Sequence, residues 1–482
     1  MSDVKPSYEQ THVGIVGGGL CGCATAYFLR QLMGPAVAIT LFEKTDQLGG
    51  RVRSQRIGDD VFELGGSIFT RDNRYMSSLT DAFGLQKKIH YVDDSPLLIY
   101  GGHQKVSFST LQKSWLVAKI SFLWRYGLDL FKFHRHVSQL ADSFAKIYAI
   151  QASGRCFETP AALLTALSPD FVTMTGVTFG SWLENRMGLR KRFCNEVAHA
   201  FVASNYCQDL NVHAFVGMVS GAGSLSTLHS VVGGNNQVAK HLLDSALAEN
   251  PPDAPSSVVF AEVKSLSDGK QRRYCLEYCS NDDKKVRSAE FDYVVLACPL
   301  HQEATISAPQ DILPARSEYR VMHKCIHSGR LNYTKLGLPA ELPNKAVEGL
   351  DIMLAKSALE DPETLFQSMG SVKPEKKTTK IDSIWATFTV PERMVNPAEQ
   401  LSRTYFAKSQ LLNCTRWLAY PKYAPLKNPS VDLGTFVLAP GLIYASALEL
   451  AASCMEVAVI SGRNAALLIS TRSSKMNPSE DV

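Results

Sequence analysis

The sequence predicts an α/β protein whose first domain is built on a Rossmann-like parallel sheet. Residues 11–16 form a short apolar run, followed by a Gly-x-Gly-x-x-Gly turn at Gly17, Gly19 and Gly22 and then by an apolar helix. A second apolar run ends in Glu43, about 20 residues further on. A strand, a tight turn and a helix in this order aim backbone N–H groups and a positive helix end at one point. The sequence therefore predicts a bound dinucleotide.

The elements that follow narrow the type of dinucleotide. The carboxylate of Glu43 is expected to accept hydrogen bonds from ribose hydroxyls, and it would repel a 2′-phosphate, which disfavours NADP. The strings Leu48-Gly-Gly-Arg51 and Phe62-Glu-Leu-Gly-Gly-Ser67 come next. A Gly-Gly-Arg loop lets the backbone approach a diphosphate, and the guanidinium neutralises it. A generic NAD-binding unit is the alternative, and it has no need of these two strings.

Three distant segments together resemble the amine-oxidase-type FAD enzymes. They are residues 17–67, residues 452–467 and Val231-Val-Gly-Gly-Asn235. The resemblance implies a Rossmann-like FAD-binding domain of the glutathione-reductase type. It also implies that the backbone around Met455 and Glu456 faces the flavin and that the backbone of Val263 contacts the adenine. It assigns FAD binding to Gly17, Gly19, Leu20, Cys21, Gly22, Glu43, Lys44, Gly50, Arg51, Gly65, Gly66, Ser67, Val263, Met455 and Glu456.

A narrower resemblance joins the chain to the prenylcysteine oxidase (prenylcysteine lyase) family. It extends from about the first strand to nearly the last helix. Its most specific strings are Asn211-Val-His-Ala-Phe-Val-Gly217 and Trp417-Leu-Ala-Tyr-Pro-Lys-Tyr423, which are not general flavoprotein motifs. Further matching strings are Trp124-Arg-Tyr-Gly127, Glu63-Leu-Gly-Gly-Ser-Ile68 and Val232-Gly-Gly-Asn235.

The resemblance implies an FAD-dependent thioether oxidase that takes a small prenylated substrate and O2. Its products are cysteine, a prenyl aldehyde and hydrogen peroxide. One alternative is an oxidase of the same fold acting on another isoprenoid or prenylated aromatic compound in a biosynthetic pathway. Another is a flavin-fold protein without catalytic activity. Such a reaction needs no strong acid or base, so we assign no catalytic residue. For Ser67 a role in the turn competes with a catalytic one, and a lone histidine such as His229 is more often structural.

The predicted domains are discontinuous. Residues 1–85, 210–299 and 433–470 are expected to form the FAD-binding domain. Residues 86–209 and 300–432 are expected to form an α+β substrate-binding domain, and residues 471–482 a disordered tail.

The apolar segment at residues 111–150 has a helical pattern whose apolar residues cover more than one face. Three interpretations remain open. The segment can be a core helix of the substrate domain or the wall of a tunnel for a long apolar substrate. It can also lie on a membrane surface, which its basic residues permit. A break is expected at Ser168-Pro169, because the residue before a proline avoids the helical region.

Composition and charge exclude several other classes. The chain has 482 residues, 45% of them hydrophobic, and a net charge of +4. This weak charge without a dense basic run excludes a nucleic-acid-binding surface. The 11 cysteines lack the spacing of metal ligands, so no metal is expected. We interpret Cys21 and Cys23 as small buried residues, and the cysteine pattern favours a reducing compartment. The first ten residues are polar and predict a cytoplasmic location, although known relatives of the resembled family are lysosomal.

Overall fold

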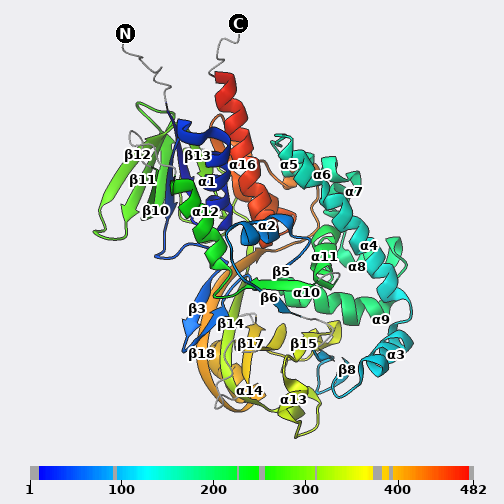
Figure 1. Cartoon of the computed structure of the whole chain (residues 1–482). Helices are drawn as coiled ribbons and strands as arrows, with labels where there is room; N and C mark the ends of the chain where they lie inside the picture. Colours follow the sequence, from blue (N-terminus) through cyan, green and yellow to red (C-terminus); the bar gives the residue numbers. More distant parts are fainter. Residues whose placement is uncertain are drawn as a thin grey trace, which may run out of the picture.

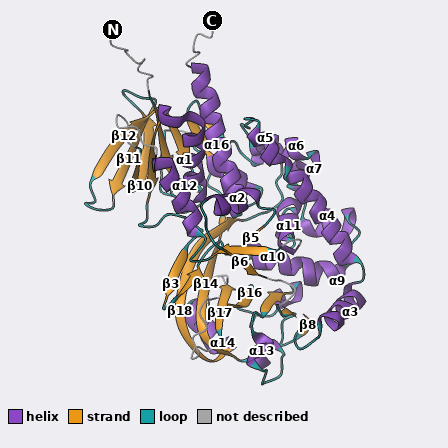
Figure 2. Cartoon of the chain, viewed as in Figure 1, coloured by secondary structure: helices purple, strands orange, loops and turns teal. Residues whose placement is uncertain are grey.

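The computed structural model describes residues 10–90, 95–224, 227–248, 256–309, 312–372, 383–389 and 394–476. Figure 1 shows a sheet with three long helices, a second sheet below it, and a layer of shorter helices along one side. Figure 2 shows the same division by type of element. One large hydrophobic core joins the first sheet to the helical layer, and a second core lies against the second sheet.

The first sheet has the strand order β12-β11-β10-β2-β1-β13-β20-β19. The five central strands run parallel, because β10, β2, β1, β13 and β20 pair in parallel with their neighbours. Side chains of parallel strands are buried on both faces, which explains their continuous apolar runs. The strands are β1 (Thr11–Val16), β2 (Val37–Glu43), β10 (Ser257–Asp268), β11 (Tyr274–Ser280), β12 (Val286–Phe291), β13 (Tyr293–Leu296), β19 (Val437–Ala439) and β20 (Leu442–Tyr444).

Three helices cover this sheet: α1 (Leu20–Met33), α12 (Asn236–Ala248) and α16 (Met455–Met476). Helix α1 packs against both of the others. Gly462 permits the close approach of α16, because a Cβ there would lie 2.5 Å from the carbonyl oxygen of Cys21. The first and last regular helices of the chain therefore share one interface, as Figure 1 shows.

The second sheet has the strand order β18-β14-β17-β16-β15-β7-β8. Its strands are β7 (Leu97–Tyr100), β8 (Val106–Ser109), β14 (Tyr319–Leu331), β15 (Asp351–Leu354), β16 (Ser368–Val372), β17 (Ile384–Thr389) and β18 (Phe406–Pro421). Strands β14 and β18 pair over almost their whole length, and Cys325 lies opposite Cys414. These two cysteines form a disulfide with 4.1 Å between their Cα atoms. This disulfide differs from the cysteine pattern of a reducing compartment that the sequence favours, and 89 residues separate its members, so the sequence did not indicate the pair.

The helical layer contains short helices where the sequence predicts long ones. The apolar segment at 111–150 forms three helices, and the first break falls at Gly127, whose φ of +58° favours glycine. The predicted break at Ser168-Pro169 is confirmed. The helices are α3 (Trp115–Tyr126), α4 (Asp129–Phe144), α5 (Lys146–Ala152), α6 (Pro160–Leu167), α7 (Pro169–Met174), α8 (Phe179–Ser181), α9 (Lys191–Phe193), α10 (His199–Tyr206) and α11 (Ala214–Ser220), with π-helical turns at Trp182–Arg186 and Cys194–Ala198.

Smaller elements connect these layers. They are the hairpin of β3 (Ser54–Ile57) and β4 (Asp60–Glu63), the small sheet of β5 (Phe69–Thr70), β9 (Leu228–Val231) and β6 (Lys87–His90), and the helices α2 (Arg74–Ala82), α13 (Asn344–Val347), α14 (Pro397–Tyr405) and α15 (Pro429–Asp432). Among the described residues, no helix combines the length and apolar character needed to cross a bilayer.

The predicted domain division stays a prediction, and contacts in the structure bear on its boundaries. Helix α11 contacts α4, α7, α8 and α10, so residues 214–220 lie with the helical layer. Among the elements that the structure describes, the first one after α11 to pack extensively against α1 is α12, which favours a boundary nearer Asn236 than residue 210. Helix α16 continues to Met476, so the predicted disordered tail is wrong for residues 471–476. Residues 477–482 lie outside the described residues.

Candidate functional site

The glycine turn after β1 has the geometry that the sequence predicts. Gly17 has a φ of +113°, which L side chains rarely adopt, and its N–H donates to the carbonyl of Phe42 at 2.8 Å. A Cβ on Gly22 would lie 2.0 Å from the carbonyl oxygen of Gly17, so no larger residue fits the first turn of α1. Gly19 is the N-cap of that helix, where Leu20 and Cys21 are buried.

The N-terminus of α1 is open to an anion. It has no side-chain cap and no acidic residue in its first turn. The second glycine loop lies beside it: Gly19 and Gly49 form a parallel bridge, and the N–H of Gly49 donates to the carbonyl of Gly18 at 2.8 Å. A Cβ on Gly19 would meet nothing closer than the Cα of Gly50 at 3.8 Å. Two glycine loops and a helix dipole thus leave a cradle that suits a diphosphate.

Glu43 lies at the carboxyl end of β2 and is buried. Its Oε2 accepts a hydrogen bond from the N–H of Gly18 at 2.8 Å, and its Oε1 accepts from the N–H and the hydroxyl of Thr45. Each carboxylate oxygen has about two acceptor positions, so Oε2 keeps one for a ribose hydroxyl. The carboxylate therefore also shapes the glycine turn. The next residue, Lys44, is exposed. Burial raises the pKa of the Cys298 thiol, just after β13, to about 11, and the positive charge of Lys44 opposes this rise.

The guanidinium of Arg51 has partners in the protein that the sequence did not indicate. It forms an ion pair with Glu449 and donates to the carbonyl of Ala419 at 2.9 Å. Glu449 also accepts from the hydroxyl of Tyr319 at 2.7 Å. A buried carboxylate needs such donors, because leaving a charge unpaired away from water is costly. For Arg51, contact with a diphosphate stays a prediction.

The loop Gly65-Gly66-Ser67 is held by the buried side chain of Asn235. Its Nδ2 donates to the carbonyls of Gly66 at 3.0 Å and Ser67 at 2.9 Å, and its Oδ1 accepts from the N–H of Val231 at 2.8 Å. Gly65 itself is obligatory, because a Cβ there would lie 1.8 Å from the carbonyl oxygen of Arg51. The Val-Gly-Gly-Asn string therefore fixes a loop far away in the sequence.

Lys324 is a site residue that the sequence analysis missed. It lies on β14, is 4% exposed, and its Nζ donates to the hydroxyl of Ser67 at 3.0 Å. Burial lowers the pKa of Lys324 to about 8, and the nearby carboxylate of Glu63 opposes the shift. The ammonium also lies 4.7 Å from the centre of the Phe388 ring. A lysine among apolar strand residues gives no local signal, and only the pairing of the sheet brings it to this loop.

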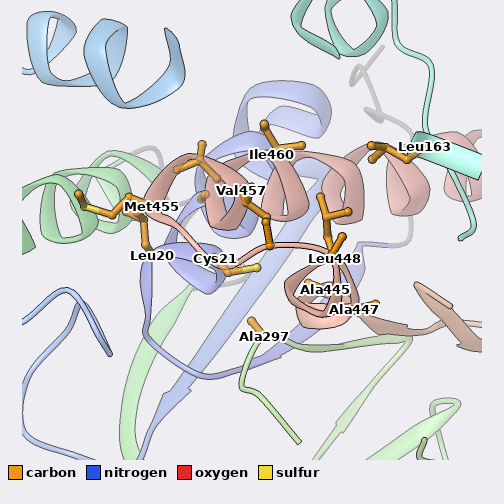
Figure 3. Packing of buried hydrophobic residues seen from close by; sticks show 14 of the residues in the cluster. Leu20, Cys21, Leu163, Ala297, Ala445, Ala447, Leu448, Met455, Val457 and Ile460 are labelled. Carbon is orange, nitrogen blue, oxygen red and sulfur yellow. The ribbon is translucent and has the colours of Figure 1, made fainter. Parts of the chain in front are cut away.

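Met455 and Glu456 begin the last helix, and their side chains point in different directions. A Cβ on Gly66 would lie 3.5 Å from the Cγ of Met455, so this residue lies against the Gly65–Ser67 loop. In the view of Figure 3 it lies near Leu20, the first residue of α1. The carboxylate of Glu456 instead accepts from the N–H groups of Tyr75 and Met76, in the first turn of α2, and from the hydroxyl of Tyr148.

The remaining predicted residue, Val263, is buried in β10. This strand pairs with β2 so that Phe260 lies opposite Glu43, and Val263 follows three residues later. The carboxyl ends of β1, β2, β10, β13 and β20 lie at one edge of the sheet, because these strands run parallel. A hollow of about 460 Å³ near Tyr293 and Gly441 lies at the opposite edge, where β13 and β20 begin, and is not part of this site.

Two strings that resemble the prenylcysteine oxidase family, Asn211–Gly217 and Trp417–Tyr423, contact this site or each other. The indole N–H of Trp417 donates to the carbonyl of Leu64 at 2.8 Å, and Ala419 accepts from Arg51. Tyr423 accepts from the N–H of His213 at 2.7 Å, which joins the second string to the first. Burial lowers the pKa of His213 to about 4, so this imidazole is neutral and serves as the cap of α11.

These residues fit a dinucleotide such as FAD. The cradle around Gly19 is open, the helix end is uncapped, and Glu43 keeps acceptor capacity for a ribose. The hydroxyl of Tyr423 is buried without a hydrogen-bond partner in the part of the chain that the structure describes. Orphaned buried hydroxyls are costly, and a bound polar group would satisfy this one. No cluster of three or more His, Cys, Asp or Glu is placed to hold a metal among the described residues.

Comparisons with known proteins identify relatives over the whole chain. The prenylcysteine lyase family model matches residues 110–481, and a model of the NAD(P)-binding Rossmann-like domain matches residues 15–83. Prenylcysteine oxidase 1 of Mus musculus is 28% identical over 495 residues, covering 100% of this chain and 92% of the relative. Prenylcysteine oxidase 1 of Homo sapiens is 29% identical over 485 residues, covering 95% and 88%.

Solved structures give an independent comparison of the fold. Wild-type putrescine oxidase bound to putrescine has a TM-score of 0.60 at 17% identity, covering 96% of this chain and 99% of that one. Cyclohexylamine oxidase from Brevibacterium oxydans has a TM-score of 0.59 at 16% identity, covering 96% and 100%. At such low identity the likeness concerns the fold alone, and it confirms the predicted amine-oxidase-like α/β architecture.

Proposed function

Because the chain belongs to the prenylcysteine lyase family, and is thus a flavoprotein oxidoreductase, we propose that it cleaves S-prenylcysteine with FAD and O2. The products are cysteine, a prenyl aldehyde and hydrogen peroxide. The relatives that support this proposal are matched over about nine tenths of their length, 92% and 88%.

One observation carries the proposal. It concerns the string Trp417–Tyr423, which is specific to the resembled family. The indole N–H of Trp417 donates to the carbonyl of Leu64, and the carbonyl of Ala419 accepts from Arg51. Both partners belong to the loops for which we predict contact with FAD. The family-specific part of β18 is therefore attached to the predicted cofactor loops, where a substrate would have to meet the flavin.

The proposed reaction balances as an oxidation followed by hydrolysis. A hydride leaves the carbon that is bonded to sulfur, and both the sulfur and the neighbouring alkene stabilise the resulting cation. Water adds to this carbon and loses a proton. The hemithioacetal then breaks its C–S bond and gives the aldehyde and the thiol. Bound FAD would supply the electron sink for the hydride, and O2 would take both electrons and leave as hydrogen peroxide.

The chain supplies positioning, an apolar wall and one group that exchanges protons. Tyr206 packs edge-on against Tyr420 and Tyr423, with ring centres 5.2 and 5.4 Å apart. This aromatic cluster adjoins Ala419, whose carbonyl accepts from Arg51, and its rings suit an alkene chain. Lys324 Nζ lies at the Ser67 loop, and with a pKa near 8 it can accept the proton that adding water releases.

Anaerobic mixing of the FAD-loaded protein with S-farnesylcysteine tests the proposal. We expect the flavin absorbance to bleach, and farnesal and peroxide to form when air is admitted. S-methylcysteine is the matched control, because it has no alkene to stabilise the cation. Bleaching by another isoprenoid or by a prenylated aromatic compound, and not by S-farnesylcysteine, would replace the substrate in the proposal. A protein that cannot be loaded with FAD would overturn it.

A further inference from the structure

Helix α3 and the start of α4 expose an unusual number of large apolar side chains. Trp124 is 88% exposed, Phe131 64% and Leu128 63%. Isolated exposed apolar residues are normal, but a contiguous group marks an interaction surface. The members of this group, which we call the α3 face, are Trp115, Leu116, Val117, Ile120, Leu123, Trp124, Leu128 and Phe131.

The opposite side of α3 holds the helix in place. Tyr126 is 1% exposed, and its ring and that of Phe122 pack edge-on against Phe108 of β8. The hydroxyl of Tyr126 donates to Glu196, which also binds Arg125. The helix is thus anchored by its inner side, and the α3 face stays largely exposed among the residues that the structure describes.

Basic side chains surround this face. Residues 111–136 contain five lysines and arginines, of which Arg125 is paired with Glu196, and a single acidic residue, Asp129. Asp129 is buried and paired with Arg190, so its charge is neutralised. Lys119 lies 4.0 Å from the centre of the Trp115 ring, and Lys132 and Arg135 are exposed on α4. The rim of the α3 face is therefore positive, and it has charge complementarity to an anionic surface.

The position in the fold suits a flat partner. Figure 1 shows α3 at the outer edge of the molecule, at the far end of the helical layer from the first sheet. Its 12 residues are too few to span a bilayer. Exposed tryptophans beside lysines and arginines are typical of helices that lie in the lipid headgroup region.

We propose that the α3 face docks the protein on a lipid bilayer that contains anionic lipids. The apolar side chains enter the boundary between headgroups and acyl chains, and the basic rim binds the anionic headgroups. The lysines and arginine of this rim that have no ion-pair partner among the described residues favour this occupant over a second copy of the chain, whose own rim would repel it. This inference concerns binding and does not depend on the proposed reaction.

Co-sedimentation of the full chain with vesicles tests the inference. The vesicles contain phosphatidylcholine alone, or phosphatidylcholine with about 30% phosphatidylserine. We expect binding to the mixed vesicles that weakens at high salt. The double variant Trp124→Asp/Leu128→Asp should lose it by about tenfold or more, because charged groups cannot enter the acyl boundary. Val431→Asp is the matched control, since Val431 is also exposed but lies outside the α3 face.

A second variant separates the two parts of the surface. Lys119→Glu/Lys132→Glu leaves the apolar residues intact and should abolish the preference for phosphatidylserine. Equal binding of wild type and the double aspartate variant would overturn the inference. A wild-type protein that sediments with neither kind of vesicle would overturn it as well. A wild-type dimer that dissociates in the aspartate variant, without vesicle binding, would assign the face to a second copy instead.

Discussion

The ammonium group of Lys324 donates a hydrogen bond to the hydroxyl of Ser67 over 3.0 Å, which joins the second sheet to the predicted flavin loop. Replacing Lys324 with Met should lower the rate of thiol release by about 100-fold, because the proton acceptor is lost. In wild type the rate should rise as the pH passes through about 8, where Nζ becomes neutral. In the variant this rise should be absent. Steady-state rates between pH 6 and 10 measure both effects.

The control for this variant is Lys408→Met, which removes an exposed lysine of β18. It should leave the rate and its pH dependence unchanged. FAD content is determined in parallel, so that loss of cofactor is distinguished from loss of proton transfer. A Lys324→Met variant with full FAD content and a wild-type pH profile would remove Lys324 from the mechanism.

Glu43→Ala should weaken FAD binding by about tenfold or more, because the ribose acceptor is lost. It also leaves the N–H of Gly18 without its acceptor, which costs about 1–3 kcal/mol of stability. Equilibrium dialysis and denaturant unfolding measure the two effects. Asp46→Ala is the control, since Asp46 is exposed and close in sequence. Full FAD retention in the Glu43 variant would show that the ribose assignment is wrong.

Asn235→Ala should release the Gly65–Ser67 loop. The variant loses the buried amide contact to Val231 and the partly buried contacts to Gly66 and Ser67, and we expect its free energy of unfolding to fall by about 3 kcal/mol. FAD binding should weaken as well. Asn185→Ala removes an exposed amide and serves as the control. Thermal unfolding with and without FAD measures the change. A stability equal to that of the control would show that Asn235 does not hold the loop.

We expect the free energy of unfolding to depend on pH because of the buried carboxyl group of Glu456. Burial raises the pKa of its carboxyl from 4.5 to about 7, against the hydrogen bonds from Met76, Tyr75 and Tyr148. The folded state therefore holds a proton that the unfolded state loses, so stability from this group is present below pH 4.5 and is lost as the pH rises through 7.

Glu456→Gln cannot titrate. Between pH 4.5 and 7 the stability of wild type relative to this variant should fall by about 3 kcal/mol. Urea unfolding at several pH values measures the difference. Glu158→Gln, at an exposed carboxylate, should show no comparable trend. A constant difference across this pH range would mean that Glu456 is ionised throughout.

The sequence identifies the parts of the site that depend on local geometry. Gly17, Gly22 and Glu43 lie where predicted, because a strand, a turn and a helix in a fixed order leave little freedom. The resemblance places Met455 correctly at the start of the last helix. The loop around Ser67 also lies beside Met455, as expected for segments that share one ligand.

The residues that the sequence misses depend on contacts between distant segments. Arg51 and Glu449 are 398 residues apart, and nothing near either residue indicates the other. Lys324 is indistinguishable from a surface lysine until β14 pairs with β17 and β18. Gly127 ends α3 because its backbone has a positive φ. The apolar residues of segment 111–150 cover more than one helical face, so their pattern did not predict a break at this position.

The strand order of the first sheet also constrains how the chain is made. Strand β1 lies in the centre of the sheet, yet its neighbour β13 begins at Tyr293 and the next strand, β20, at Leu442. During synthesis from the N-terminus, the glycine turn therefore leaves the ribosome long before its sheet can close. The apolar strands of the nascent chain therefore stay exposed until almost the last helix is translated. Chaperones bind such exposed apolar segments, so we expect them to bind this nascent chain.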